Sequence, residues 1–201
     1  MTGITHTTAL WYASRATGVV TMLLLTAVVV LGILVNRQGR LPGLPAFAVT
    51  GLHRNVSLLA VAFLVIHVVT AIVDPFVTIG LAAAALPFAS AYKPFWLGLG
   101  AISLDLIAAL ILTSLARARI GRRAWRGIHW LAYAAWPLAI LHSLGSSTGA
   151  RSGLELSVLA GCVLATAAGL TWRLSHAARQ VPRAGRAAAA LREAPAREAM
   201  R

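Results

Sequence analysis

The chain has 201 residues, of which 59% are hydrophobic and 11% are charged, and its mean hydropathy is +0.79. Soluble domains carry about 25% charged residues, so this composition indicates a membrane protein. The 18 Lys and Arg residues outnumber the five Asp and Glu residues, which gives a net charge of +13. Because the arginines punctuate apolar runs and do not form one face, they are typical of topology signals, and no binding to nucleic acid is expected.

Length and cysteine content exclude several kinds of redox domain. Several membrane spans would fill this chain, so we expect no fused flavin domain and no flavin or NAD(P)H site within it. Cys162 is the only cysteine. A single cysteine excludes a disulfide framework, a Cys-ligated iron–sulfur cluster and the covalent attachment of c-type haem. Any redox centre must therefore use other ligands.

Five apolar segments are long enough to cross a membrane, which takes about 20 residues of helix. The sequence therefore predicts an all-α integral membrane protein, a bundle of five transmembrane helices. The expected spans are residues 14–35, 52–73, 95–115, 127–145 and 153–172. Residues 76–92 are also apolar but short for a span, and we expect them to form an interfacial or re-entrant piece.

These spans divide the chain into three predicted parts. Residues 1–13 form an N-terminal segment, and residues 14–172 form the membrane domain. Residues 173–201 are rich in Ala, Arg and Pro. They are predicted to form a mobile basic tail, in which residues 186–193 could form one short surface helix.

The distribution of cations predicts the orientation. Fifteen of the 18 Lys and Arg residues lie next to the first connection, in the third connection or after the last span. The opposite side has only Arg15, Lys93 and Arg151. By the positive-inside rule, the N-terminus lies outside and the tail lies in the cytoplasm, as an odd number of spans requires. We expect the plasma membrane as the location.

Four histidines fall within the predicted spans, where ionisable groups are costly and are by default functional candidates. His53 and His67 lie 14 residues apart in the second span, and His129 and His142 lie 13 apart in the fourth. These two spans run in the same direction, so the histidines form two pairs at two depths. Neutral imidazole is a good axial ligand for haem iron, and two stacked bis-histidine sites would let electrons cross the membrane.

A pair of haem sites requires that both histidines of each span face the same side, and an ideal helix meets this requirement in only one of the two spans. On an ideal helix His53 and His67 lie within about 40° of each other, whereas His129 and His142 lie about 140° apart. Pro137 between the latter two predicts a kink that could change their register.

Other functions compete with haem binding. Each histidine could simply form a hydrogen bond between helices. The histidines could also line the path of a metal-ion permease, or hold haem in a membrane anchor subunit that transfers no electrons. Asp105 in the third span is either a proton or quinone contact or, as we favour, a partner for a neighbouring Ser or Thr.

The motifs around the histidines resemble the ferric-reductase-like transmembrane family, which includes the membrane parts of ferric reductases and NADPH oxidases and the haem-binding subunit of methionine sulfoxide reductase. The similarity covers residues 11–172. It rests on the 14- and 13-residue spacings and on four stretches of sequence: GLHR at 51–54, YKPFWLGLG at 92–100, RRAWRGIH at 122–129 and LHS at 141–143.

The resemblance implies two b-type haems, an inner one on His53 and His129 and an outer one on His67 and His142. It further implies that Arg15 pairs with the outer propionates, although Arg15 could equally be an interfacial arginine. Two further arginines are candidates for the inner propionates, Arg54 and Arg126. The donor would be a separate cytoplasmic flavoprotein or membrane quinol, and the outer acceptor ferric iron, dioxygen or a redox partner.

Overall fold

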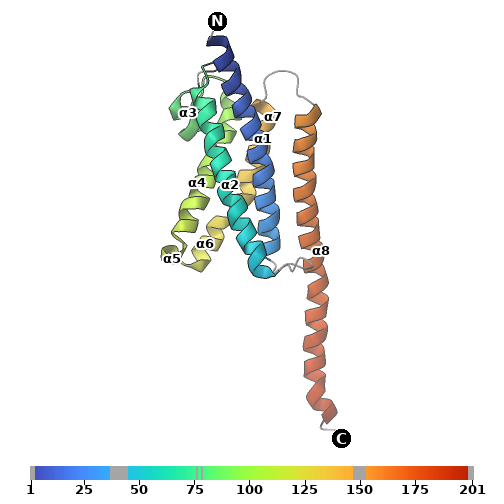
Figure 1. The fold of residues 1–201 in the computed structure, drawn as a ribbon. Helices are drawn as coiled ribbons and strands as arrows, with labels where there is room; N and C mark the ends of the chain where they lie inside the picture. Colours follow the sequence, from blue (N-terminus) through green and yellow to red (C-terminus); the bar gives the residue numbers. More distant parts are fainter. Residues whose placement is uncertain (1–2, 37–44, 76, 78, 147–152, 199–201) are drawn as a thin grey trace.

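The computed structural model describes residues 3–36, 45–75, 77, 79–146 and 153–198, and this part of the chain is helical with no strand. Figure 1 shows long helices that run along one common axis. Their bounds are α1 Gly3–Asn36, α2 Ala46–Val73, α3 Leu81–Ala85, α4 Pro94–Leu115, α5 Arg117–Ile120, α6 Arg122–His129, α7 Ala132–Ser146 and α8 Gly153–Glu198.

Within these described residues, four helices are long and apolar enough to span a membrane: α1 over Ala9–Val35, α2 over Phe47–Val73, α4 over Pro94–Leu115 and α8 over Gly153–Ser175. They correspond to four of the five predicted spans. Many large apolar side chains on them are exposed, including Leu58 and Val65. Such a surface suits lipid and not water, so the chain is a multi-pass membrane protein.

The predicted span at 127–145 differs from the structure. The segment is divided between the amphipathic helix α6, which ends at His129, and α7, which begins at Ala132. Helix α7 has 15 residues, so it extends about 22 Å, less than the roughly 30 Å of the hydrocarbon core. A fifth full-length spanning helix is therefore not confirmed.

The two ends of the chain also differ in extent from the sequence prediction. Helix α1 begins at Gly3, within the segment predicted to precede the first span. Helix α8 continues to Glu198, so helix covers most of the predicted tail, residues 173–201. The start of α1 and the end of α8 lie at opposite ends of the molecule (Figure 1).

Helix α3 lies at the same end of the bundle as the start of α1, whereas α5 and α6 lie at the other end (Figure 1). It is the helical part of the segment predicted to be interfacial or re-entrant, and it contacts α4 and α2. After it, Lys93 adopts the left-handed conformation (φ 40°) before α4. The Lys93 Nζ donates to the Gly145 and Ser146 carbonyls, at 3.0 and 3.4 Å, and so caps the end of α7.

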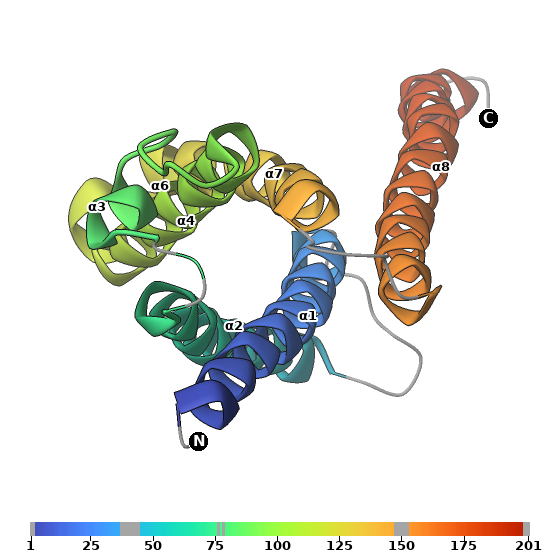
Figure 2. The same ribbon diagram turned by 90° about the horizontal axis from the view of Figure 1, so that it is seen from above.

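Two helix pairs form the frame of the site. Helix α1 packs along α2, and α4 packs along α7, while α1 also contacts α7 and α8. Viewed along the bundle axis, α1, α2, α4 and α7 are arranged in a ring, and α8 lies outside it against α1 (Figure 2). Met22, Ile140, Leu159 and Cys162 form a buried cluster that joins α1, α7 and α8. Cys162 is thus a small packing residue, as expected.

Candidate functional site: two facing histidine pairs

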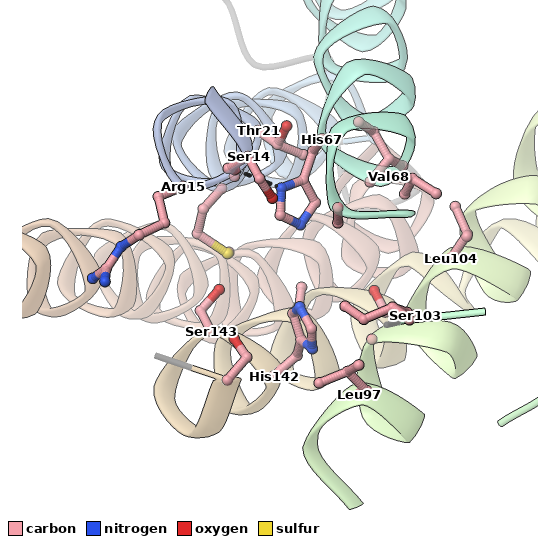
Figure 3. Close-up of a pocket in the computed structure, with 18 of the residues that line it drawn as sticks. Ser14, Arg15, Thr21, His67, Val68, Leu97, Ser103, Leu104, His142 and Ser143 are labelled. Carbon is pink, nitrogen blue, oxygen red and sulfur yellow. Dashed lines mark hydrogen bonds between the residues drawn. The ribbon is translucent and has the colours of Figure 1, made fainter. Parts of the chain in front are cut away.

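The structure brings His67 and His142 face to face. His67 is on α2 and His142 is on α7, and their ring centroids lie 6.5 Å apart with the ring planes at 76°. Both line a cavity of about 260 Å³. Figure 3 shows the two imidazoles on opposite walls of this cavity, pointing toward each other. The sequence spacing predicted that these two histidines lie at the same depth of the bundle, and the structure confirms this for His67 and His142.

Backbone carbonyls fix the tautomer of both rings. The Nδ1 of His67 lies 2.8 Å from the carbonyl oxygen of Ser14, and the Nδ1 of His142 lies 2.9 Å from that of Trp96. A carbonyl can only accept, so in each ring Nδ1–H is the donor and the proton stays there. Each neutral imidazole then has its lone pair on Nε2, the nitrogen with which such histidines bind metals.

His53 and His129 form the second pair. His53 is on α2 and His129 ends α6, with ring centroids 6.4 Å apart and ring planes at 68°. The ring of Trp125 lies 4.9 Å from that of His129. Burial lowers the pKa of His129, which lies outside the four candidate spans, and so favours a neutral imidazole. The Nδ1 atoms of His53 and His129 are buried and have no hydrogen-bond partner in the described part of the chain.

A break between helices α6 and α7 lets both His129 and His142 face the histidines of α2. Between them, Trp130, Leu131, Tyr133 and Ala134 donate to carbonyls three residues earlier. A turn of this type advances about 120° per residue and not 100°, so roughly five residues add about 100°. That rotation removes most of the 140° mismatch of an ideal helix. The correction lies at the α6–α7 junction, before Pro137, and not in the predicted kink.

The spacing of both pairs fits a metal centre bound from two sides. A metal–imidazole bond is about 2 Å long and the nitrogen lies roughly 1.1 Å from the ring centroid, so two rings on one metal have centroids about 6.2 Å apart. The observed 6.4 and 6.5 Å are close to this value. Helix α2, which carries one ring of each pair, makes no extensive contact with α4, α6 or α7, so the rings face each other across a slot between helices.

The cavity between His67 and His142 is mainly apolar. Its walls include Leu25, Leu64, Leu104 and Ile107 from three helices. Apolar walls with two facing imidazoles suit a flat hydrophobic macrocycle such as haem. They do not suit a hydrated ion. In the residues that the structure describes, no group of three or more His, Cys, Asp or Glu side chains is placed to hold a metal ion.

The three predicted arginines occupy different surroundings. Arg15 lines the cavity, and its guanidinium lies 2.6 Å from the carboxylate of Glu155 on α8 and 4.6 Å from the Trp11 ring centre. Arg54 and Arg126 are exposed at the other end of the bundle, close in sequence to His53 and His129. The pairing of any of them with propionates remains a prediction.

Some site residues were not predicted from the sequence. Glu155 reaches the cavity from α8, and Ser14 and Trp96 act through their carbonyls, which no side-chain pattern reveals. Asp105 is exposed on the outside of α4 and does not line the cavity. The position of Asp105 therefore supports neither a role in the site nor the buried hydrogen bond to Ser or Thr that we favoured.

Two facing histidine pairs on a helical frame with four candidate spans define the described part of the chain as a multi-pass membrane protein whose histidines are paired at two depths. Within that class, the chain belongs to the ferric-reductase-like family, because residues 17–140 match the model of the "Ferric reductase like transmembrane component". The match includes His53, His67 and His129, and it ends two residues before His142. Neither curated proteins nor solved structures gave a match to this chain.

Proposed function

We propose that this protein is a transmembrane electron-transfer protein that holds two b-type haems. His53 and His129 would bind the inner haem, and His67 and His142 the outer one. The observation that carries the proposal is the spacing of the ring pairs, 6.4 and 6.5 Å, at two depths of one bundle. Membership of the ferric-reductase-like family supports electron transfer across a membrane as the general function.

Each haem, when bound, supplies a one-electron iron couple. The chain's own residues position and isolate it. The Ser14 and Trp96 carbonyls hold the proton of His67 and His142 on Nδ1, so both Nε2 atoms stay free to bind iron. The apolar side chains that form most of the cavity wall would limit the access of water and competing ions to the haem. The 14 residues between His53 and His67 correspond to about 21 Å of helix, a suitable distance for a two-step relay across most of the membrane.

We propose that the protein lies in the plasma membrane. Its N-terminus would be outside the cell and its C-terminus in the cytoplasm. Cations concentrate at the end of the bundle that carries α5 and α6 and in the sequence that follows the span of α8. This asymmetry supports a cytoplasmic location for that end. His53 and His129 then lie toward the cytoplasm.

For the electron donor and the electron acceptor, we propose chemical classes and not particular molecules. A cytoplasmic flavoprotein could dock on the arginine-rich end, or membrane quinol could reduce the inner centre. Ferric iron, dioxygen or a redox partner would then accept electrons outside. The proposal makes the chain the membrane subunit of an oxidoreductase.

Optical spectroscopy tests the haem proposal directly. Protein purified from haem-replete cells should show a reducible b-type spectrum with close to two haems per chain. A folded but colourless preparation would overturn the proposal, and uptake of metal ions by vesicles without a haem spectrum would favour a permease.

A liposome assay tests the electron transfer itself. With an impermeant reductant enclosed and ferricyanide outside, liposomes containing the protein should reduce the outer acceptor, and protein-free liposomes should not. If haem-loaded protein did not transfer electrons from the enclosed reductant to the outer acceptor, it would be an anchor subunit and not an electron-transfer protein.

A further inference from the structure

Two glycines lie directly beneath the imidazoles of the outer pair. A Cβ atom added to Gly18 on α1 would lie 2.9 Å from Cε1 and 3.0 Å from Nδ1 of His67. A Cβ atom added to Gly100 on α4 would lie 2.5 Å from Nδ1 and 2.7 Å from Cε1 of His142. Real Cβ atoms essentially never lie closer than 3.0 Å to such a neighbour, so a larger residue at either position would force the ring or its helix to move.

Each of these glycines lies four residues after the carbonyl that binds the same ring. His67 donates to Ser14 and contacts Gly18, and His142 donates to Trp96 and contacts Gly100. Residues four apart lie on the same face of a helix. Because glycine has no side chain, the imidazole can rest on that face and reach the carbonyl one turn earlier. The combination of a glycine and the carbonyl four residues before it is called here an imidazole cradle.

A third, looser imidazole cradle lies against the ring of His53. A Cβ atom on Gly32 would lie 3.4 Å from Cε1 of His53, and the carbonyl of Val28, four residues earlier, faces this ring without closing a hydrogen bond of good geometry. Gly18 and Gly32 are 14 residues apart, as are His53 and His67. The antiparallel helices α1 and α2 therefore place the same arrangement at both depths.

We infer that Gly18 and Gly100 are positioning residues for the outer haem, and that Gly32 serves the inner haem in a weaker form. Each of the two outer cradles fixes the ring plane of an axial histidine and keeps the proton on Nδ1, whereas the Gly32 cradle offers only the close approach. The inference rests on the proposed function. Other glycines differ, since Gly98 faces the ring of Phe88 and Gly145 that of Trp96, and neither ring belongs to a histidine pair.

The test compares Gly18→Ala and Gly100→Ala with Gly51→Ala and Gly127→Ala. The control glycines are also helical, lie two residues from His53 and His129, and have open space at their Cβ positions. Alanine favours helix over glycine, so lost helix propensity cannot explain a defect. Loss of a second-sphere contact typically weakens metal binding by about 10- to 100-fold. We expect a loss of this size for the outer haem in both cradle variants, and full loading in both controls.

Electron paramagnetic resonance provides a readout that a packing defect would not change. The remaining outer centre should show altered low-spin g values and a high-spin fraction, while the inner centre stays unchanged and serves as an internal measure of folding. The contact distances predict the largest effect for Gly100→Ala, a smaller one for Gly18→Ala, and a slight effect, on the inner haem only, for Gly32→Ala. This graded order keeps the test decisive if Gly100→Ala does not fold.

Three outcomes would overturn the inference. They are full outer-haem loading with an unchanged spectrum in both cradle variants, equal loss of both haems, and equal effects in the controls. If wild-type protein carries two haems, any of these results leaves the proposed function intact. Wild-type protein without haem would instead overturn the proposed function, and this inference with it.

Discussion

The guanidinium of Arg15 and the carboxylate of Glu155 form an ion pair of 2.6 Å that links α1 to α8 at the edge of the cavity between His67 and His142. Their side chains are only 29% and 19% exposed. Glu155 also lies in the first turn of α8, where a carboxylate interacts favourably with the helix dipole. Because α8 packs outside the helix ring, this pair contributes to its attachment.

The ion pair predicts coupling between Arg15→Gln and Glu155→Gln. Each single variant leaves a partly buried charge without this partner, so the double variant should be less destabilised than the sum of the singles. Coupling of about 1 kcal/mol is expected for a pair with this exposure. Denaturant unfolding of the four proteins in detergent micelles would measure it. Additive effects would show that the pair contributes nothing to the attachment of α8, and the exposed Arg119→Gln serves as a control.

The second prediction concerns the independence of the two histidine pairs. His67→Ala should remove the outer haem and leave about one haem per chain, because a single imidazole binds haem weakly in an apolar slot. His53→Ala should do the reverse. Haem content and reductive titration of each variant would give the result. If both variants lost both haems equally, the pairs would not be separate sites.

The sequence predicted those features that depend on local composition and spacing. Hydropathy located four of the spans, and the 14-residue spacing placed His53 and His67 on one side of α2. Continuous apolar sequence hid the break between α6 and α7, since hydropathy does not report a tightened turn. The Arg15–Glu155 pair and the imidazole cradles were also missed, because they depend on how α1 and α4 lie against other helices.

The third prediction tests the proposed orientation. In a Cys162→Ala background, Ala91→Cys would place a thiol at the end of the bundle with α3, and Arg123→Cys would place one at the end with α6. Both positions are exposed, whereas Cys162 is buried and can be removed at small cost. A membrane-impermeant maleimide applied to intact cells should label the first variant and not the second. Labelling of only Arg123→Cys would reverse the orientation.

The fourth prediction concerns a buried hydrogen bond that joins the two helices on one side of the slot. The Ser103 hydroxyl on α4 donates to the Ala135 carbonyl on α7 at 2.9 Å, and Ser103 is only 4% exposed. Interhelical hydrogen bonds in membrane proteins contribute about 0.6 kcal/mol on average and up to roughly 1.7 kcal/mol. Ser103→Ala should therefore lower the free energy of unfolding by an amount in this range.

The matched control is Ser157→Ala. The Ser157 hydroxyl donates to the Leu154 carbonyl within α8 and is exposed, so its loss should have almost no effect on stability. Unfolding in mixed micelles, followed by circular dichroism, would compare the two variants. Equal stability of Ser103→Ala and the wild type would mean that the packing of α4 on α7 depends on the close fit at Gly100 and Gly145, and not on this bond.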